Sequence, residues 1–160
     1  ADGFANLRSL ELVGRGAALG IAHYGALTIK ETAAFPAEAL SGGAFRHGPL
    51  ELVDAPAGVI ILVPSGPTAG LGVRLAREIA KAGWMSWVIG AHREVGQLAT
   101  EGWGSGAGPR LVVTGVSAGD GPLAALPFVV PLQQLAAVLA ERHGRVPGQL
   151  LRGTKVTETE

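Results

Sequence analysis

The residues best suited to carry out chemistry lie between Lys30 and His47. Glu31 follows Lys30 in an apolar stretch, Glu38 lies in "FPAEAL", and Arg46 precedes His47 in "FRHGPL". A carboxylate can act as a general base and an imidazole titrates near neutral pH, so the pair suits proton transfer. Taken singly, Glu31 is better explained as a solvated surface charge and His47 as a surface histidine. For Glu38 we expect a structural role, in which loop amides donate hydrogen bonds to the carboxylate.

A second group of polar side chains follows the apolar run at residues 58–64. In "VPSGPTAGL", Ser65 and Thr68 precede a helical pattern, so their hydroxyls and the first helical N–H groups could cradle a phosphate. The alternative is an ordinary helix N-cap with Gly and Pro shaping the turn, and Pro64 and Pro67 remove two N–H donors. The "GRG" at 14–16 leaves the same choice between an anion site and a tight turn. The stretch does not match the dinucleotide-binding fingerprint G-x-G-x-x-G, because position 19 is leucine where that pattern needs glycine.

Composition excludes several classes of function. The 160 residues contain 13 Lys and Arg against 13 Asp and Glu, so no basic field attracts nucleic acid or a membrane surface. Cysteine is absent and the four histidines are scattered, so we expect neither a metal site nor a bound cofactor. We also expect no bilayer-spanning stretch and a cytoplasmic location. At 16% charged residues, apolar surface should face another subunit or domain.

The pattern of elements predicts an α/β fold. Apolar runs predict strands at 10–13, 58–64, 84–90 and 110–115, and helical spacing predicts helices at 17–34, 68–84 and 126–144, with Pro131 as a kink or as the true start of the last helix. Residues 91–109 read as a loop or weak helix. Strands that alternate with helices indicate a parallel sheet covered on both faces. The tail at 151–160 should be mobile unless it docks on another surface.

Three stretches together resemble a known family. They are "LVGRG", "GALTIKETAAFPAEAL" and "GGAFRHGPLELVD", which follow the family order of G-R-G, G-A-L-x-x-K-E, A-E-A and G-E-x-x-H-G-P-L. The chain is similar to the second sugar-isomerase (SIS) domain of glucosamine-6-phosphate synthase and to the related fructosamine-phosphate deglycases. The similarity continues through "PFVVPLQQLAAVLA" into the C-terminal tail.

The resemblance implies a fold, a reaction and partners. The fold is a flavodoxin-like three-layer sandwich with a mainly parallel sheet of four to five strands, and residues 1–160 are a single SIS domain, the C-terminal half of a two-SIS protein. The substrate is a sugar 6-phosphate or an amino-sugar phosphate, interconverted between aldose and ketose. Glu31 takes the place of the general base. His47 takes that of the histidine that assists ring opening and reaches the neighbouring subunit's site, so the partners are another SIS domain and a homodimer mate.

The chain departs from the family pattern at several positions. Thr28 replaces a lysine one turn before Glu31, and Ala44 replaces the glutamate of G-E. The tail lysine that handles the open sugar is displaced, so Lys155 is its candidate, with Thr154 beside it as a substrate contact. The family's main phosphate loop, S-x-S-G-x-T, belongs to the first SIS domain, and residues 65–68 hold the equivalent position here. These departures keep a second function open, a non-catalytic phosphosugar-binding or dimerisation module.

Overall fold

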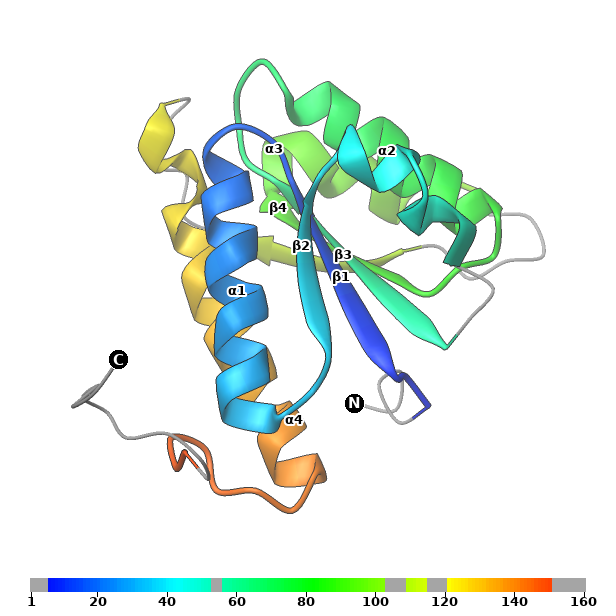
Figure 1. Ribbon diagram of the computed structural model, residues 1–160. Helices are drawn as coiled ribbons and strands as arrows, with labels where there is room; N and C mark the ends of the chain where they lie inside the picture. Colours follow the sequence, from blue (N-terminus) through cyan, green and yellow to red (C-terminus); the bar gives the residue numbers. More distant parts are fainter. Residues whose placement is uncertain (1–5, 53–55, 103–108, 115–120, 151–160) are drawn as a thin grey trace.

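Parallel strands form the centre of the molecule. The computed structural model describes residues 6–52, 56–102, 109–114 and 121–150 (Figure 1). Its five strands pair in parallel in the order β2-β1-β3-β4-β5. They are β1 (Ser9–Gly14), β2 (Ala37–Ser41), β3 (Ala57–Val63), β4 (Ser86–Ala91) and β5 (Arg110–Thr114). This order is the flavodoxin-like one, which confirms the predicted fold class.

Helices cover both faces of the sheet. The α-helices are α1 (Ala17–Ala33), α2 (Ala69–Lys81), α3 (His92–Val95) and α4 (Val129–Arg142), and the 3-10 turns are η2 (Ala44–Arg46), η3 (Pro49–Leu52), η4 (Gly96–Ala99) and η5 (Pro122–Phe128). Figure 1 shows α1 and α4 on one side and α2 with α3 on the other. Because successive strand residues point to opposite faces, Leu10 and Leu12 join the α1 core whereas Val13 joins the α2 core.

One element differs from the sequence prediction. Strand β2 was not predicted, because "AEALS" is an edge strand with only Ala37 buried, so no apolar run or strict alternation marks it. The described residues at 91–102 contain the short helix α3 and the turn η4, in agreement with the predicted loop or weak helix. Of the two alternatives for Pro131, the start of the helix is confirmed, since Pro131 lies in the first turn of α4, where its missing N–H costs no hydrogen bond.

The expectation that no stretch is long and apolar enough to cross a bilayer was wrong. By length and composition alone, η5 and α4 together meet that test over Pro122–Arg142. In the fold, however, α4 packs against α1, and its Leu132, Ala136, Leu139 and Ala140 are buried in the core between the two helices and the sheet. Core helices of this kind pass the same test, and here the segment covers one face of the sheet.

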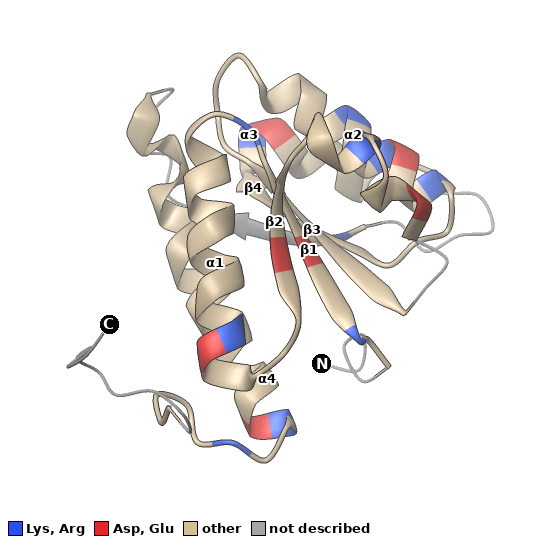
Figure 2. Cartoon of the chain, in the orientation of Figure 1, with Lys and Arg blue, Asp and Glu red and all other residues tan. Residues whose placement is uncertain are grey.

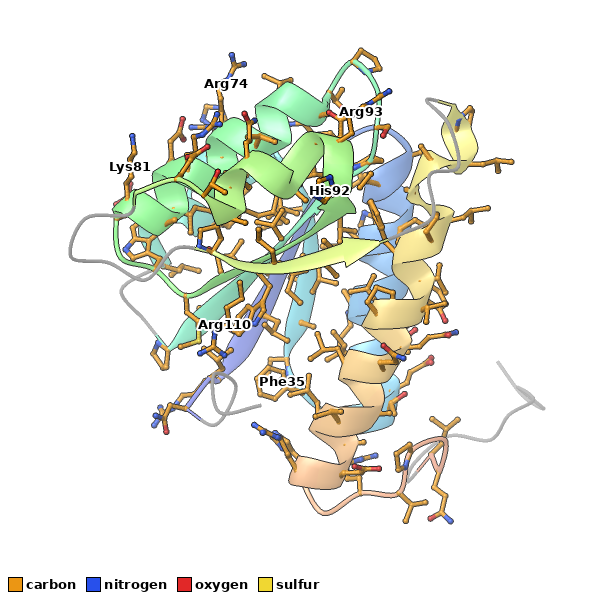
Figure 3. All side chains as sticks on the ribbon, turned by 180° about the vertical axis from the view of Figure 1, so that it is seen from behind. Phe35, Arg74, Lys81, His92, Arg93 and Arg110 are labelled. Carbon is orange, nitrogen blue, oxygen red and sulfur yellow. The ribbon has the colours of Figure 1, made fainter. Side chains whose placement is uncertain are left out.

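Charge is distributed unevenly over the two helical layers. Arg74 and Lys81 project from the outer side of α2 (Figure 3). The α1 layer has no charged residue at 17–29 or at 121–140, and its exposed side chains include large apolar ones. We call this surface the apolar helical face; it comprises Tyr24, Leu27, Leu123, Leu126, Val130 and Val138. The scarcity of charged residues in the sequence is therefore greatest in the layer formed by α1 and α4.

Candidate functional site

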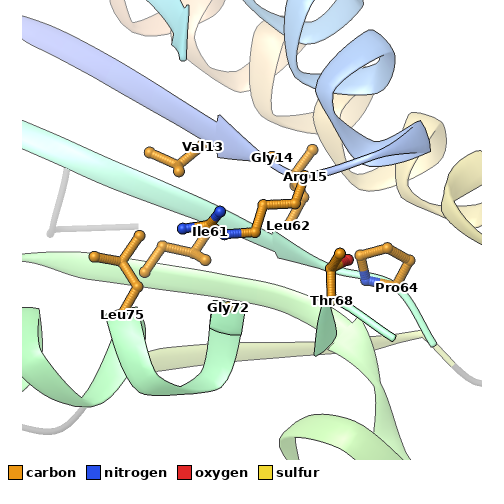
Figure 4. Close-up of a pocket in the computed structure, with 9 residues that line it drawn as sticks. All are labelled: Val13, Gly14, Arg15, Ile61, Leu62, Pro64, Thr68, Gly72 and Leu75. Carbon is orange, nitrogen blue, oxygen red and sulfur yellow. The ribbon is translucent and has the colours of Figure 1, made fainter. Parts of the chain in front are cut away.

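A pocket lies outside the carboxyl ends of β1 and β3, where the strand order reverses. Ligands of open α/β sheets bind at such a position, because the connections leave the two neighbouring strands on opposite faces. The pocket is lined by Val13, Gly14, Arg15, Ile61, Leu62, Pro64, Thr68, Gly72 and Leu75 (Figure 4). Its cavity volume is about 10 Å³, roughly enough for one water molecule. The Arg15 side chain runs from the end of β1 across it.

Three glycines determine where Arg15 lies. A Cβ atom at Gly14 would collide with the backbone of Ala18 in the first turn of α1, and Gly16 has a φ of +55°, which side chains disfavour. A Cβ atom at Gly42, after β2, would lie 2.5 Å from Arg15 Nε. The Gly42 N–H also donates to the Gly14 carbonyl oxygen at 3.2 Å. The "GRG" turn therefore needs its glycines for close packing, and the space beside Gly42 receives the guanidinium.

Ser65 and Thr68 lie at the start of α2, next to this pocket. Ser65 is buried, with 8% of its surface exposed, and Thr68 lines the pocket. Thr68 is the N-cap residue of α2, yet its hydroxyl makes no capping hydrogen bond, so the capping role considered for its side chain is not found. The first N–H groups of a helix point out of its N-terminus without intrahelical partners. The structure therefore brings Arg15, Thr68 and the start of α2 together.

His47 lies on a surface turn beside α2. It is exposed and caps η2, with its N–H donating to the Ala44 carbonyl oxygen at 3.0 Å. Buried Phe45 anchors this turn in the α2 core, and Arg46 forms an ion pair with Glu78 of α2 at 2.6 Å. Glu78 lies ten residues beyond Thr68, and at 1.5 Å per residue this separates the two by roughly 15 Å along the axis. His47 is therefore not part of the pocket.

Glu31 lies at the other end of the domain. It is exposed in the last turns of α1, whereas the pocket lies where α1 begins. From Ala17 to Glu31 the helix rises roughly 20 Å. Tyr24, Leu27 and Glu31 are spaced at i, i+3 and i+7 and share one side of α1, so Glu31 borders the apolar helical face. In this chain by itself, Glu31 therefore lies at the surface.

Within one copy of the chain, the predicted site residues thus fall in three places. Ser65 and Thr68 are adjacent, His47 is beside α2, and Glu31 is at the far end of α1. Thr154, Lys155 and the whole tail at 151–160 lie outside the described residues. Glu38 accepts no hydrogen bond from loop amides within the described part of the chain, because it is an exposed residue of β2.

Sequence reasoning missed Arg15 as a candidate ligand. Its position inside a glycine turn that directly follows a buried strand was a usable signal, but the turn was considered only for its backbone amides. The side chain's place depends on Gly42, which is 27 positions away along the chain. That contact requires the pairing of β1 with β2, which was not predicted.

Comparison with known proteins gives consistent results. The SIS domain family model matches residues 3–89. The chain is 30% identical over 147 residues to the isomerizing glutamine–fructose-6-phosphate aminotransferase of Thermococcus kodakarensis, and 28% identical over 158 residues to that of Yersinia pseudotuberculosis. These alignments cover 92% and 99% of this chain but 23% of each relative. The chain thus spans less than a quarter of the length of these curated relatives.

Solved structures with this fold include two sugar-phosphate enzymes. The C-terminal domain of glucosamine-fructose-6-phosphate aminotransferase from Francisella tularensis aligns with a TM-score of 0.74 at 25% identity, covering 92% of this chain and 39% of that one. Tagatose-6-phosphate ketose/aldose isomerase from Escherichia coli aligns with a TM-score of 0.75 at 24% identity, covering 96% and 42%. The fold of this chain agrees with both structures. Because the SIS family model matches more than half of the chain, the chain belongs to the SIS domain family.

Proposed function

We propose that this chain is the proton-transfer half of a phosphosugar isomerase or deglycase, and that a second SIS domain completes its active site. The observation that carries the proposal is the place of Glu31, exposed at the border of the apolar helical face. A carboxylate base works best when its proton affinity is raised toward the working pH, and burial does this. A domain that covers Tyr24 and Leu27 would also cover Glu31. Docking would therefore both bury apolar surface and activate the base.

In this function the residues have separate tasks. Glu31 removes the proton from the carbon next to the carbonyl group of the open-chain sugar and returns it to the neighbouring carbon, through an enediol. His47 carries the proton of the ring oxygen during ring opening. Since His47 is far from Glu31 in one copy, it serves the site of another subunit, which requires a homodimer. By the family resemblance, Lys155 would handle the open-chain sugar and Thr154 would contact the substrate.

The lengths of the relatives support a partner domain. This chain covers 39% of the Francisella domain and 42% of the Escherichia coli isomerase, so each of those proteins has room for a second unit of this size. The names of these two proteins refer to fructose 6-phosphate and tagatose 6-phosphate, which supports a ketose or aldose phosphate as substrate. The experiment is to follow solvent-proton exchange at C1 of fructose 6-phosphate and at C2 of glucose 6-phosphate by NMR with the chain joined to its partner domain. Absence of exchange for every hexose 6-phosphate tried would contradict the proposal.

A second candidate is a phosphosugar-binding module without catalysis, and the Arg15 pocket favours it. A guanidinium offers planar paired donors to phosphate oxygens, and the Thr68 hydroxyl and the start of α2 add further donors. This pocket is roughly 20 Å from Glu31, so a sugar phosphate bound there cannot reach the base of the same chain. Ser65, which is buried beside Thr68, would support the turn or donate to the phosphate.

Phosphosugar binding by this module can be tested by titrating the chain alone with glucose 6-phosphate. We expect weak binding, because the pocket has room for about one water molecule and Arg15 must move before a phosphate can enter. Arg15→Gln should weaken binding about tenfold, the effect of losing one charge-assisted hydrogen bond. Arg74→Gln, an exposed cation on the outer side of α2, is the matched control and should leave the affinity unchanged. Equal loss in both variants would mean that only net charge attracts the ligand.

A further inference from the structure

A larger cavity lies at the amino edge of the sheet, far from the Arg15 pocket. Its volume is about 480 Å³, and it is lined by Ser9, Leu10, Glu11, Lys30, Pro36, Ala37 and Glu38. Glu11 of β1 and Glu38 of β2 are directly paired across the two parallel strands. Their side chains therefore leave the same face of the sheet, from Cα atoms roughly 4.8 Å apart. Figure 2 shows the two acidic positions as adjacent red bands on β1 and β2.

Glu11 is the unusual member of this pair. Only 8% of its surface is exposed, and its Oε2 atom is buried with no hydrogen-bond partner among the described residues. Burial raises the pKa of the Glu11 carboxyl above its ordinary value of 4.5, and the neighbouring Glu38 carboxylate raises this pKa further. Buried polar atoms in proteins nearly always have a partner, so an unpaired oxygen on a carboxyl group that lines a cavity points to a donor beyond the described residues.

We infer that this cavity is a binding site for the primary ammonium group of a small organic amine, held between Glu11 and Glu38, for which glucosamine serves as the probe. An ammonium group has three donors, so one group can serve the free Glu11 oxygen and the exposed Glu38 carboxylate together. The volume lies in the range of roughly 300 to 1,000 Å³ that is typical of small-ligand sites, which leaves room for a carbon skeleton with hydroxyl groups. The site is independent of the phosphosugar function and of Arg15.

A metal ion fits the same groups less well. Calcium takes six to eight oxygen ligands, and the described residues contain no group of three or more His, Cys, Asp or Glu that could hold a metal ion. Lys30 lines the cavity as well, and its charge opposes a divalent cation twice as strongly as a monovalent one. Lys30 forms no ion pair within the described residues, so its ammonium lies beyond ion-pair distance of Glu11 and Glu38 and leaves both carboxylates open to a ligand.

The test is a titration of the chain with glucosamine, followed by two-dimensional ¹H–¹⁵N NMR. N-acetylglucosamine, in which the amine is neutral, is the matched ligand control. We expect glucosamine to shift the amide signals of the first residues of β1 and β2, and N-acetylglucosamine to leave them unchanged. Glu11→Gln should weaken binding at least tenfold, because a charge-assisted hydrogen bond is lost in a buried place. Glu38→Gln, at an exposed position, should weaken it about threefold.

Two further variants sharpen the result. Lys30→Gln removes the competing ammonium and should tighten glucosamine binding about threefold, an effect that general loss of structure cannot produce. Glu141→Gln, at an exposed position of α4, should change nothing. If Glu11→Gln fails to fold, Glu11→Leu serves instead, since an apolar side chain suits this buried position.

The inference is overturned by any of three results: equal binding of the two sugars, displacement of glucosamine by MgCl₂ at equal concentration, or an unchanged affinity in the Glu11 variant. None of these results bears on the phosphate site, which is tested separately by titrating the wild-type chain and Arg15→Gln with glucose 6-phosphate.

Discussion

The two edges of the parallel sheet hold their charged side chains in different ways. At the carboxyl edge, one cation, Arg15, lies in a space left by Gly42 and lines a pocket of about 10 Å³. At the amino edge, Glu11 and Glu38 line a cavity of about 480 Å³, and one buried oxygen has no partner among the described residues. The carboxyl edge is closely packed around its charge, whereas the amino edge leaves open space beside its two carboxyl groups.

This difference follows from the direction of the strands. Every helix that follows a strand begins at the carboxyl edge, so its N-terminus and the glycine turn before it gather anion-binding groups there. Helix C-termini and the starts of strands meet at the amino edge, and α1 brings Lys30 and Glu31 to it. A chain with groups for chemistry at both edges can serve two neighbours, one at each edge. The predictions below test this division, beginning with the largest effect.

The first prediction concerns Glu31 in the assembled enzyme. Glu31→Gln keeps the shape of the side chain and removes the base, so proton exchange at C2 of the sugar phosphate should slow by about 10²-fold or more, with little change in substrate affinity. The measurement is NMR exchange in deuterated water, and Glu141→Gln is the control. Equal exchange rates in wild type and the Glu31 variant would remove Glu31 from the mechanism and favour the binding module.

The second prediction concerns the apolar helical face. We expect the chain to self-associate through it at micromolar concentration, as measured by sedimentation. Leu27→Glu should weaken association by about 2 kcal/mol, roughly thirtyfold, because a buried leucine contributes about this much. Leu52→Glu is the matched control, since Leu52 is an exposed leucine of η3 outside this face. A wild-type chain that is monomeric at all concentrations would show that this face is covered by something other than a second copy.

The sequence predicted the fold better than it predicted the site, and particular residues show why. Strands β3 and β4 are continuous apolar runs, so a local pattern was sufficient to find them. Strand β2 carries one buried alanine, and its place beside β1 depends on pairing that no local pattern records. Ser65 and Thr68 were found because a strand and a helix flank them. Glu11 lay unnoticed within a predicted strand, because its importance depends on facing Glu38.

The third prediction tests whether Arg15 itself, and not the surrounding turn, binds the phosphate. Gly42→Ala places a methyl group where the Arg15 guanidinium lies, 2.5 Å from Nε, so the flexible side chain must move. Glucose 6-phosphate affinity should fall about tenfold while the melting temperature changes little. Gly43→Ala is the neighbouring control, because the nearest atom to its Cβ is 3.8 Å away. Similar losses in both variants would mean that the turn as a whole, and not Arg15, binds the phosphate.

The fourth prediction concerns Glu11 and the free energy of unfolding. Glu11→Leu should stabilise the unliganded chain by about 1 kcal/mol at pH 8, because it removes a buried unpaired charge. Since the Glu11 pKa is raised in the fold, the stability linked to its protonation is fully present below the unfolded value of 4.5 and is lost as pH rises through the folded pKa. The advantage of the leucine variant should therefore shrink as pH falls toward 4.5. Urea unfolding at several pH values measures this, and a constant difference would mean that the fold does not raise the Glu11 pKa.

The smallest effect is expected at the His47 turn, which belongs to neither edge. Arg46 and Glu78 are 37% and 52% exposed, so a double-mutant cycle with alanine should give a coupling energy of about 0.5 kcal/mol. Arg77 and Glu101 are less exposed and share three hydrogen bonds of 2.6 to 2.9 Å, so the same cycle should give about 1 kcal/mol. If the Arg46 pair proved the stronger one, the turn would be fixed electrostatically. We expect instead that buried Phe45 holds the turn, which leaves His47 exposed and correctly placed even when the ion pair is broken.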